Sequence, residues 1–337
     1  MYPIKNKIFD IFEYRIMPSS FGSNYVEIVG LVKSSITKSI RHLIIPSKIE
    51  ELPVFKIGVG AFMDNHFIEE VHMPDTINLI SSAAFQHCTA LENIHFSENL
   101  MFIMSDAFRC CHKLKQIILP DSVIEIDERA FSECGMVTKL KLSKNLKRIR
   151  ANAFDTCFNI EELNIPSSLE YIGDSAFARC YNIKQLQMPC KVEKIGNYAF
   201  SYCKALTNVT LPPSLKSVNS NSFYKCPIKY LLVGEIEDVS LAKFVCNFTQ
   251  TLKKIKIISD ISDRISNKYL IQNDALYYWS YKIGNWVLVR FLPLSNLTSF
   301  QIPAGIPVYD LAFEDCDIEL TCEKKGEIKY IHDFNDL

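Results

Sequence analysis

The sequence of this 337-residue chain predicts a strand-rich solenoid, in which short repeats stack side by side around a shared apolar core. Three observations lead to this fold class. Phenylalanine recurs every 23 residues, cysteine recurs three residues after it, and apolar residues keep the same phase between successive phenylalanines. Because a unit of 23 residues cannot enclose a core alone, each unit has to bury its apolar face against its neighbours.

The phenylalanine ladder runs through seven intervals without an insertion. Each ring follows an alanine, except the last, which follows Ser222. A single helical or 3₁₀ turn is expected over the shared A-F-x-x-C segment, and stacking of the units would place successive rings in an offset column. The members are Phe62, Phe85, Phe108, Phe131, Phe154, Phe177, Phe200 and Phe223.

Seven of the 12 cysteines share one position of the repeat, and Cys316 after Phe313 makes an eighth. Neighbouring thiols at strand spacing could in geometry form disulfides. The alternative is a small residue that packs and bonds to backbone, and Asn65 in the same slot of the first unit favours it. We therefore expect structural free thiols at Cys88, Cys111, Cys134, Cys157, Cys180, Cys203 and Cys226.

Two short extended segments are predicted in each unit. The first contains a period-two apolar step that ends at a proline, as in Ile117, Leu119 and Pro120, because proline lacks a backbone donor for ladder pairing. The second is indicated by the next apolar pair, such as Leu169 with Ile172. The sequence therefore predicts two strands per repeat, with the turn between them.

The repeat consensus I-G-x-x-A-F-x-x-C-x-x-[LI]-x-x-L-x-[IM]-P, seen over residues 172–189, resembles the BspA-like (Treponema pallidum-type) leucine-rich repeat. The resemblance covers residues 40–233 and implies an α/β solenoid, rich in strands, that forms a horseshoe or right-handed superhelix. Residues 45–62 resemble the lengthened first repeat of that family. Residues 269–293 resemble the hairpin that interrupts such arrays, and residues 300–316 resume the pattern.

Three regions are predicted along one continuous domain, with two independent domains as the less favoured alternative. Residues 1–39 are expected to form an N-terminal cap, with a hairpin around 19–23 and a strand over 25–31. Residues 40–234 form the regular array. Residues 235–337 hold degenerate repeats, one further strand at Leu252 to Ile257, the hairpin insertion and a C-terminal cap.

Composition excludes several functional classes. The 37 basic and 38 acidic residues give a net charge of −1, which lacks the basic footprint of a nucleic-acid binder or a polybasic membrane-surface protein. No run of about 18 apolar residues is present to span a bilayer. Charged residues interrupt the first 17 residues, so a secretory signal is not predicted. Location in the cytoplasm is the default expectation, whereas the resemblance implies the cell surface.

Catalytic motifs are absent: the sequence contains no G-x-S-x-G, H-E-x-x-H, G-x-x-x-x-G-K or G-x-G-x-x-G. We therefore predict a non-enzymatic chain without a cofactor. Two histidine clusters are candidate zinc sites, because imidazole and thiolate are zinc ligands. Solvated histidines are the favoured interpretation of both, so no metal site is predicted. The first cluster is His72 and His95 with Glu70; the second is His87, Cys88, Cys110, Cys111 and His112.

The exposed sheet face is the candidate binding surface, because stacked repeats create extended surfaces of this kind. Its side chains are polar and mixed in charge. The alternative to a binding role is that these side chains are simply solvated. An aromatic cluster between Tyr277 and Phe291 is a candidate second contact patch, or else a packed hairpin. The candidate residues on the sheet face are Glu70, His72, Asn93, His95, Gln116, Lys139, Lys141, Glu162, Asn164 and Gln185.

These observations predict a protein-binding module whose partner is another protein or a ligand on a host surface. The resemblance implies a surface antigen or adhesin. An intracellular scaffold or recognition protein is the alternative, and a metal-dependent enzyme is less favoured.

Overall fold

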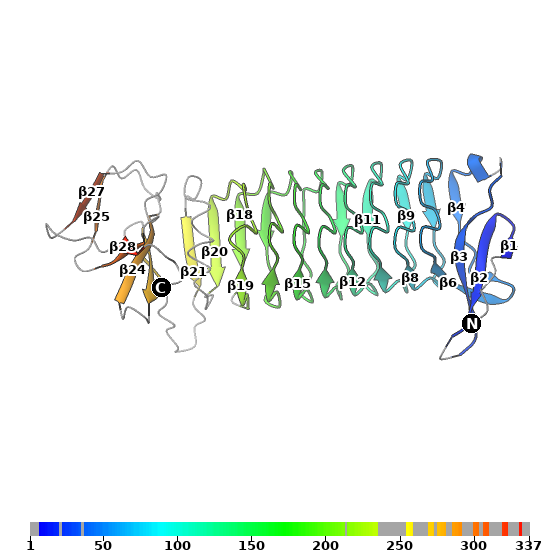
Figure 1. Cartoon of the computed structure of the whole chain (residues 1–337), viewed down its shortest axis with the longest axis horizontal. Coiled ribbons are helices and arrows are strands. Elements are labelled where there is room, and N and C mark those ends of the chain that lie inside the picture. Colours follow the sequence, from blue (N-terminus) through cyan, green and yellow to red (C-terminus); the bar gives the residue numbers. More distant parts are fainter. Residues whose placement is uncertain are drawn as a thin grey trace.

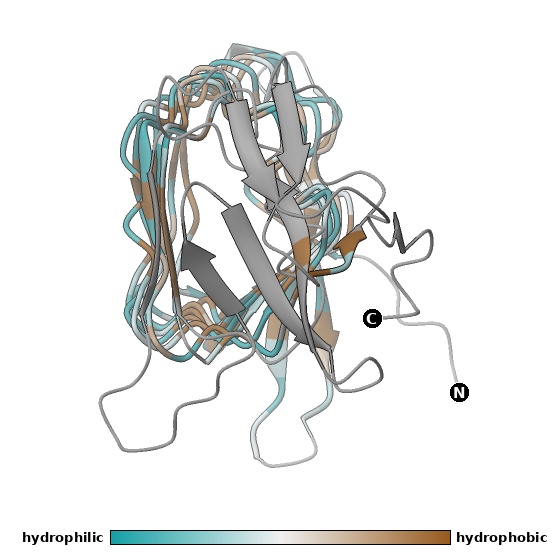
Figure 2. Ribbon diagram, turned by 90° about the vertical axis from the view of Figure 1, so that its left-hand side faces the viewer, coloured by the Kyte–Doolittle hydropathy of each residue, from teal (hydrophilic) through white to brown (hydrophobic). Residues whose placement is uncertain are grey.

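The structure is a computed structural model that describes residues 7–19, 22–34, 37–212 and 214–234, and beyond these only the strands and short segments named below. Residues 7–234 form a long stack of short strands that begins with a three-stranded cap (Figure 1). Viewed along the stack, the repeats superpose on one another with a strand wall on either side (Figure 2). The strand-rich solenoid is therefore confirmed.

One wall is the long sheet, in which each repeat contributes a short parallel strand. Most of its strands have two residues, of which the second is buried, as at Tyr171–Ile172. The second extended segment of the repeat is thus confirmed. The strands are β3 (Tyr25–Leu31), β6 (Leu52–Ile57), β8 (Leu79–Ile80), β10 (Phe102–Ile103), β12 (Glu125–Ile126), β14 (Arg148–Ile149), β15 (Tyr171–Ile172), β17 (Lys194–Ile195) and β19 (Ser217–Val218).

The opposite wall is built from the strands that precede the proline position, and it divides into three parallel ladders. In most of these strands the central residue is buried and its neighbours face outward, as the period-two pattern predicts. The ladders are β4 (His42–Ile44), β7 (Glu70–His72) and β9 (Asn93–His95); β11 (Gln116–Ile118) and β13 (Lys139–Lys141); and β16 (Gln185–Gln187), β18 (Asn208–Leu211), β20 (Tyr230–Gly234) and β21 (Lys254–Ile258).

The phenylalanine column lies between the two walls. Successive ring centroids are 4.9 to 5.5 Å apart and their planes differ by 4° to 24°, so the rings stack as expected. From Phe85 to Phe223 the rings have no exposed area. Buried aliphatic residues of both walls surround the column, and one continuous apolar core therefore extends through the repeats as far as Val233.

The A-F-x-x-C segment differs from the expected helical or 3₁₀ turn. The residues two before and two after the phenylalanine take positive φ, as at Ala83 (56°) and His87 (58°). Their N–H groups, and that of Phe85 between them, donate to carbonyls of the next repeat at 2.7 to 2.9 Å. A helix would direct these donors back along its own chain. The segment is instead a series of tight turns, which bonds each repeat to the next.

The cysteine column bonds repeats together from the inside. Each thiol of the column donates to the backbone carbonyl of the phenylalanine 26 residues earlier, at 3.0 to 3.4 Å, as from Cys134 to Phe108. All seven thiols are buried and free, so the expected structural role is confirmed. Burial raises the pKa of Cys88 to about 12 and that of Cys134 well above 9.0. In the first unit the Asn65 side chain accepts from the backbone N–H groups of Phe67 and Ile68.

The contrast between buried and exposed cysteines predicts selective alkylation. Cys190 is exposed, whereas Cys111 and Cys134 have no exposed area. Because thiolate is the reactive form and access is required, brief treatment of the native chain with iodoacetamide at neutral pH is expected to label Cys190 and spare the column. Peptide mass spectrometry reads each site, and unfolding in guanidinium should make the column react. Labelling of Cys134 at the rate of Cys190 in the native chain would contradict the buried column.

The cap contains an antiparallel sheet of β1 (Lys7–Phe9), β2 (Phe12–Met17) and β3, and β3 then pairs in parallel with β6. The strand predicted over 25–31 is confirmed, and the array continues the cap's sheet. The hydroxyl of Tyr14 donates to Glu50 at 2.6 Å, and burial raises the pKa of Tyr14 to about 12. The 3₁₀ turn η1 (Thr37–Ser39) and β5 (Lys48–Ile49) complete this end.

Beyond residue 234, β21 continues the last ladder in parallel with β20, which confirms the further strand predicted near Ile255. The predicted hairpin is present as β22 (Tyr269–Gln272), β23 (Ala275–Ser280) and β24 (Asn285–Phe291), all antiparallel. Its turn and residues 311–316 lie outside the described residues. The remaining strands are β25 (Ser299–Ile302), β26 (Val308–Tyr309), β27 (Glu319–Cys322) and β28 (Tyr330–Ile331). The boundaries at 39 and 234 stay predictions. In the part of the chain that the structure describes, no helix has the length and apolar character needed to cross a bilayer.

Candidate functional site

Eight of the ten candidate residues lie on strands of the wall that divides into three ladders, on its outward side, here called the polar face. Register puts them in two adjacent columns, because parallel strands pair in phase. Glu70 is opposite Asn93, and Gln116 is opposite Lys139. In the second column His72 is opposite His95. The polar face consists of the outward side chains of β4, β7, β9, β11, β13, β16 and β18 and of residues 161–164 between them.

One end of the polar face carries a cluster of three imidazoles around one carboxylate. Glu70 Oε1 lies 2.9 Å from Nε2 of His95 and 3.2 Å from Nε2 of His72. The other oxygen, Oε2, lies 2.8 Å from Nδ1 of His42. The rings of His72 and His95 stack, with centroids 4.1 Å apart. Hydrogen bonds from His95 and then His42 lower the pKa of Glu70 to about 2, so the carboxylate is ionised at neutral pH.

His42 is the member of this cluster that the sequence pattern missed. It lies 28 residues before Glu70, because the first repeat is longer than the others. A search at 23-residue spacing therefore passes over it. The register of β4 with β7 nevertheless pairs His42 directly with Glu70. The lengthened first repeat was itself recognised, and counting from its Ile45-Pro46 step would have placed His42 in phase.

The middle of the polar face carries two lysines on β13. Lys139 and Lys141 are both exposed, on either side of the buried Leu140. Within the described part of the chain neither ammonium group has an ion-pair partner within 4 Å, whereas the nearby Lys144 pairs with Asp121 at 3.0 Å. An unpaired charge at an exposed strand is free to attract a partner of opposite charge.

Beyond the lysines the polar face is interrupted, which the sequence pattern did not predict. Residues 161–165 fit the repeat consensus, yet they form no strand and pair with neither neighbour. Glu162 and Asn164 are exposed there, but they do not continue the ladders. A cavity of about 610 Å³ opens between this segment and β16, and Gln185 lies in its lining. Lys184 spans the opening toward Glu161 at 3.6 Å.

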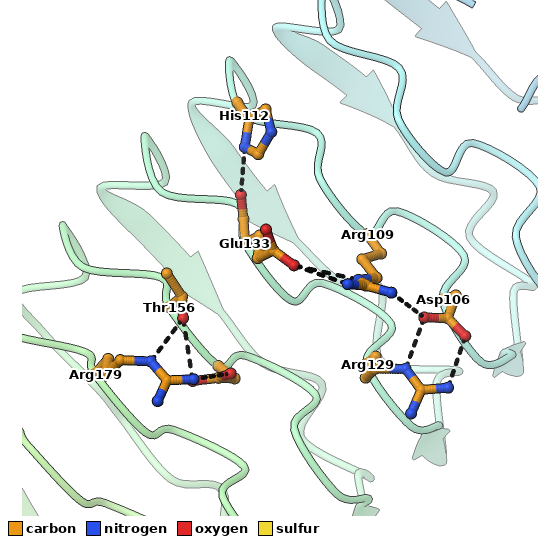
Figure 3. A network of polar contacts seen from close by, with 8 residues as sticks. Asp106, Arg109, His112, Arg129, Glu133, Thr156 and Arg179 are labelled. Carbon is orange, nitrogen blue, oxygen red and sulfur yellow. Dashed lines mark hydrogen bonds and ion pairs between the residues drawn. The ribbon is translucent and has the colours of Figure 1, made fainter. Parts of the chain in front are cut away.

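The turn side of the array carries a second polar surface, on which several charged side chains pair with one another between repeats (Figure 3). Arg129 pairs with Asp106 at 2.8 Å, and Arg109 pairs with Glu133 at 3.1 Å. His112 bonds to the backbone carbonyl of Glu133 at 3.0 Å. These contacts link consecutive repeats, so the surface has a structural role.

The second histidine cluster weighed from the sequence does not converge. The thiols of Cys88 and Cys111 point inward to backbone carbonyls. His87 bonds instead to Asp64 at 3.0 Å. The ring of His112 is engaged by the next repeat, as described above. Cys88, Cys110 and Cys111 are buried, whereas His87 is partly exposed and His112 is exposed, which separates the thiols from the imidazoles. Among the described residues, donor atoms of the kind that hold a metal come together at Glu70, His72 and His95.

The aromatic cluster near the C-terminus is only partly described. Tyr277 and Trp279 lie on β23, and Trp286 lies opposite Trp279 on β24. Tyr281 lies outside the described residues. A contact patch at this hairpin stays a prediction.

The sequence pattern of the BspA type Leucine rich repeat region matches residues 55–184 and 170–279, with 6 copies of the repeat. No curated protein matches the chain. The Treponema pallidum leucine-rich repeat protein TpLRR is 24% identical, covers 61% of this chain and 81% of its own, and has a TM-score of 0.44. A leucine-rich repeat protein of Bacteroides ovatus is 18% identical over 96% and 90% of the two chains, with a TM-score of 0.45.

The pneumococcal vaccine antigen PcpA is 17% identical, over 95% of this chain and 99% of its own, with a TM-score of 0.47. The matched repeats extend from residue 55 to residue 279, about two thirds of the sequence, and include the phenylalanine column and most of the polar face. This chain therefore belongs to the BspA-type leucine-rich repeat family.

Proposed function

We propose that this chain is a non-enzymatic module that binds another protein through the polar face, as a surface antigen or adhesin. The observation that carries the proposal is the pair of unpaired lysines, Lys139 and Lys141, at the middle of an extended face. Family membership supports a protein-interaction role. The turn side supports it too, because the charged side chains of Arg109 and Arg129 form ion pairs with Glu133 and Asp106 of neighbouring repeats.

The chemistry of the face suggests an acidic partner surface. Two ammonium groups two residues apart project to the same side of β13. Gln116, on the neighbouring strand β11, can donate and accept hydrogen bonds. Charged groups at the rim of an interface mainly raise the association rate and set its salt dependence. Binding is therefore expected to weaken as ionic strength rises.

Charge reversal tests the proposed face. The double variant Lys139→Glu and Lys141→Glu is expected to lose at least about tenfold in affinity for a partner captured by the native chain, because attraction becomes repulsion. The matched control is Lys147→Glu with Lys191→Glu, which makes the same change in net charge at exposed residues off the polar face. Surface plasmon resonance against the captured partner measures the affinity of the native chain, of the double variant and of the control. Equal affinity of the native chain and the first variant would place the contact elsewhere.

An intracellular scaffold using the same face is the second candidate. Labelling of intact cells with a membrane-impermeant biotin reagent separates the two. A surface antigen is biotinylated before lysis, whereas an intracellular scaffold is labelled only after the cells are opened. If the chain is not biotinylated in intact cells, the adhesin role is wrong, but the proposal that the polar face binds a protein still stands.

A further inference from the structure

The histidine cluster at the end of the polar face brings three donor atoms to one point. One donor atom each of Glu70, His72 and His95 lie within 4.8 Å of one another. They come from two adjacent strands, β7 and β9, whose register fixes their relative positions. The site is therefore built on rigid elements of the array, which favours a defined geometry.

The spacing of these atoms suits a small transition-metal ion. Zinc bonds to imidazole nitrogen and carboxylate oxygen at about 2.0–2.2 Å, so two ligands of a tetrahedral zinc are about 3.4 Å apart. The separations from Glu70 Oε1 to the two Nε2 atoms are 2.9 and 3.2 Å. These separations are slightly shorter than the spacing that two zinc ligands need, so the rings have to move before an ion can bind.

The donor set selects the class of ion. Two imidazoles with one carboxylate suit zinc and its neighbours, whereas magnesium and calcium take oxygen ligands. Three protein ligands leave at least one coordination position for water or for a donor from a partner. The side chains of His72 and His95 are 45% and 52% exposed, so an ion can reach them from solvent.

The two rings have to turn before they can share an ion. In the stacked arrangement their planes differ by 13°, so the in-plane directions of the two Nε2 atoms run side by side, and the Nε2 proton of each ring has to be released before that nitrogen can bind zinc. Half-exposed histidines on strands can rotate about their side-chain bonds toward Oε1. Meanwhile the other carboxylate oxygen stays bonded to His42, which would hold Glu70 in position as outer partners of metal ligands do.

From this geometry we propose that Glu70, His72 and His95 form a binding site for one zinc ion, with His42 as a positioning residue. The proposal concerns the isolated chain and does not depend on the protein-binding role. It revises the sequence expectation of no metal site, because the structure supplies the convergence that the spacing alone could not assure.

Zinc binding to the untagged full-length chain tests the proposal. Equilibrium dialysis followed by elemental analysis is expected to give one more bound zinc per chain for the native protein than for the double variant His72→Ala and His95→Ala. Taking the difference removes zinc held by thiols elsewhere. The matched control is His87→Ala, which removes an imidazole that faces a single carboxylate, Asp64, and it should bind as the native chain does.

Equal zinc content in the native chain and the double variant would overturn the site. Both replaced side chains are about half exposed, and an unchanged urea midpoint shows that the variant is folded. Cobalt supplies a second readout, because its visible spectrum reports the donor atoms. Absorption bands typical of nitrogen and oxygen ligands that vanish in the double variant support the site, whereas a thiolate charge-transfer band at the first equivalent counts against it.

The role of His42 has its own readout. His42→Ala is expected to weaken zinc binding about 10–100-fold and to leave the cobalt spectrum unchanged, because the three ligands remain. An altered spectrum would show that His42 is itself a ligand and would overturn its assignment as a positioning residue.

Discussion

Raising the pH from 8 to 10 is expected to lower the free energy of unfolding of the repeat array by about 8 kcal/mol. The cause is the cysteine column. Burial raises the pKa of six column thiols above their ordinary value of 9.0, so they stay protonated in the native state. In the unfolded chain they ionise near pH 9. The six thiols are Cys88, Cys111, Cys134, Cys157, Cys180 and Cys203.

The sign follows from the direction of the shift. A pKa raised in the native state contributes stability that is fully present below the unfolded pKa and is lost as the pH rises above it. At pH 10 the ionisation of each unfolded thiol favours unfolding by about 1.4 kcal/mol. Because all six act together, the total approaches the whole stability of a typical domain.

Urea unfolding followed by circular dichroism at pH 8, 9, 9.5 and 10, in the presence of reductant, measures this effect. The variant Cys134→Ala should release one proton fewer on unfolding, and the slope of the unfolding free energy against pH should fall accordingly. Cys190→Ala, at an exposed thiol, is the matched control. A stability that stays flat between pH 8 and 10 would refute the buried, protonated column.

Phe131→Ala is expected to destabilise the array by about 3–5 kcal/mol, the cost of removing a large aromatic side chain from a close-packed core. Phe131 has no exposed area and stacks on Phe108 at 5.1 Å and on Phe154 at 5.5 Å. The truncation leaves a cavity and interrupts the column at its middle. Because stability in a repeat array depends on contacts between neighbours, the two halves should then unfold less cooperatively.

The position in the column supplies the control. Phe62 begins the column and stacks on one ring, Phe85, so Phe62→Ala should cost less than Phe131→Ala. Met136→Ala, at a side chain that is 52% exposed, should change stability by less than about 0.5 kcal/mol. The midpoints and slopes of urea unfolding rank the three variants by their loss of stability. Equal losses at Phe62 and Phe131 would contradict a column stabilised by stacking on both sides.

The sequence predicts the repetitive features well, because each of them is sampled many times. One phenylalanine among apolar neighbours says little, but eight at one spacing define a column and the direction in which repeats stack. The register of the polar face follows from the same spacing, which is why Glu70, His72 and His95 were placed correctly. The 23-residue spacing does not predict that His42 lies beside Glu70, since the first repeat is longer.

The features that the sequence missed depend on bonds between repeats. Left-handed turn residues are usually glycine, yet here Ala83, Asn152 and Tyr202 take positive φ, because their N–H groups are bonded to the next repeat. The interruption at 161–165 is equally invisible in the pattern, since E-E-L-N-I-P fits the consensus. Whether a strand pairs depends on its distance from both neighbours, and a linear pattern does not contain that distance.

The tight turns also determine how such a chain can change in length. The turns at Phe108 and Phe131 each donate the same three N–H groups to the repeat that follows, and accept from the repeat that precedes them. Duplication or loss of a whole 23-residue unit therefore keeps every bond. Insertion of a single residue would shift the donors of one turn away from their acceptors. The array can thus lengthen the polar face in steps of one repeat without a new fold.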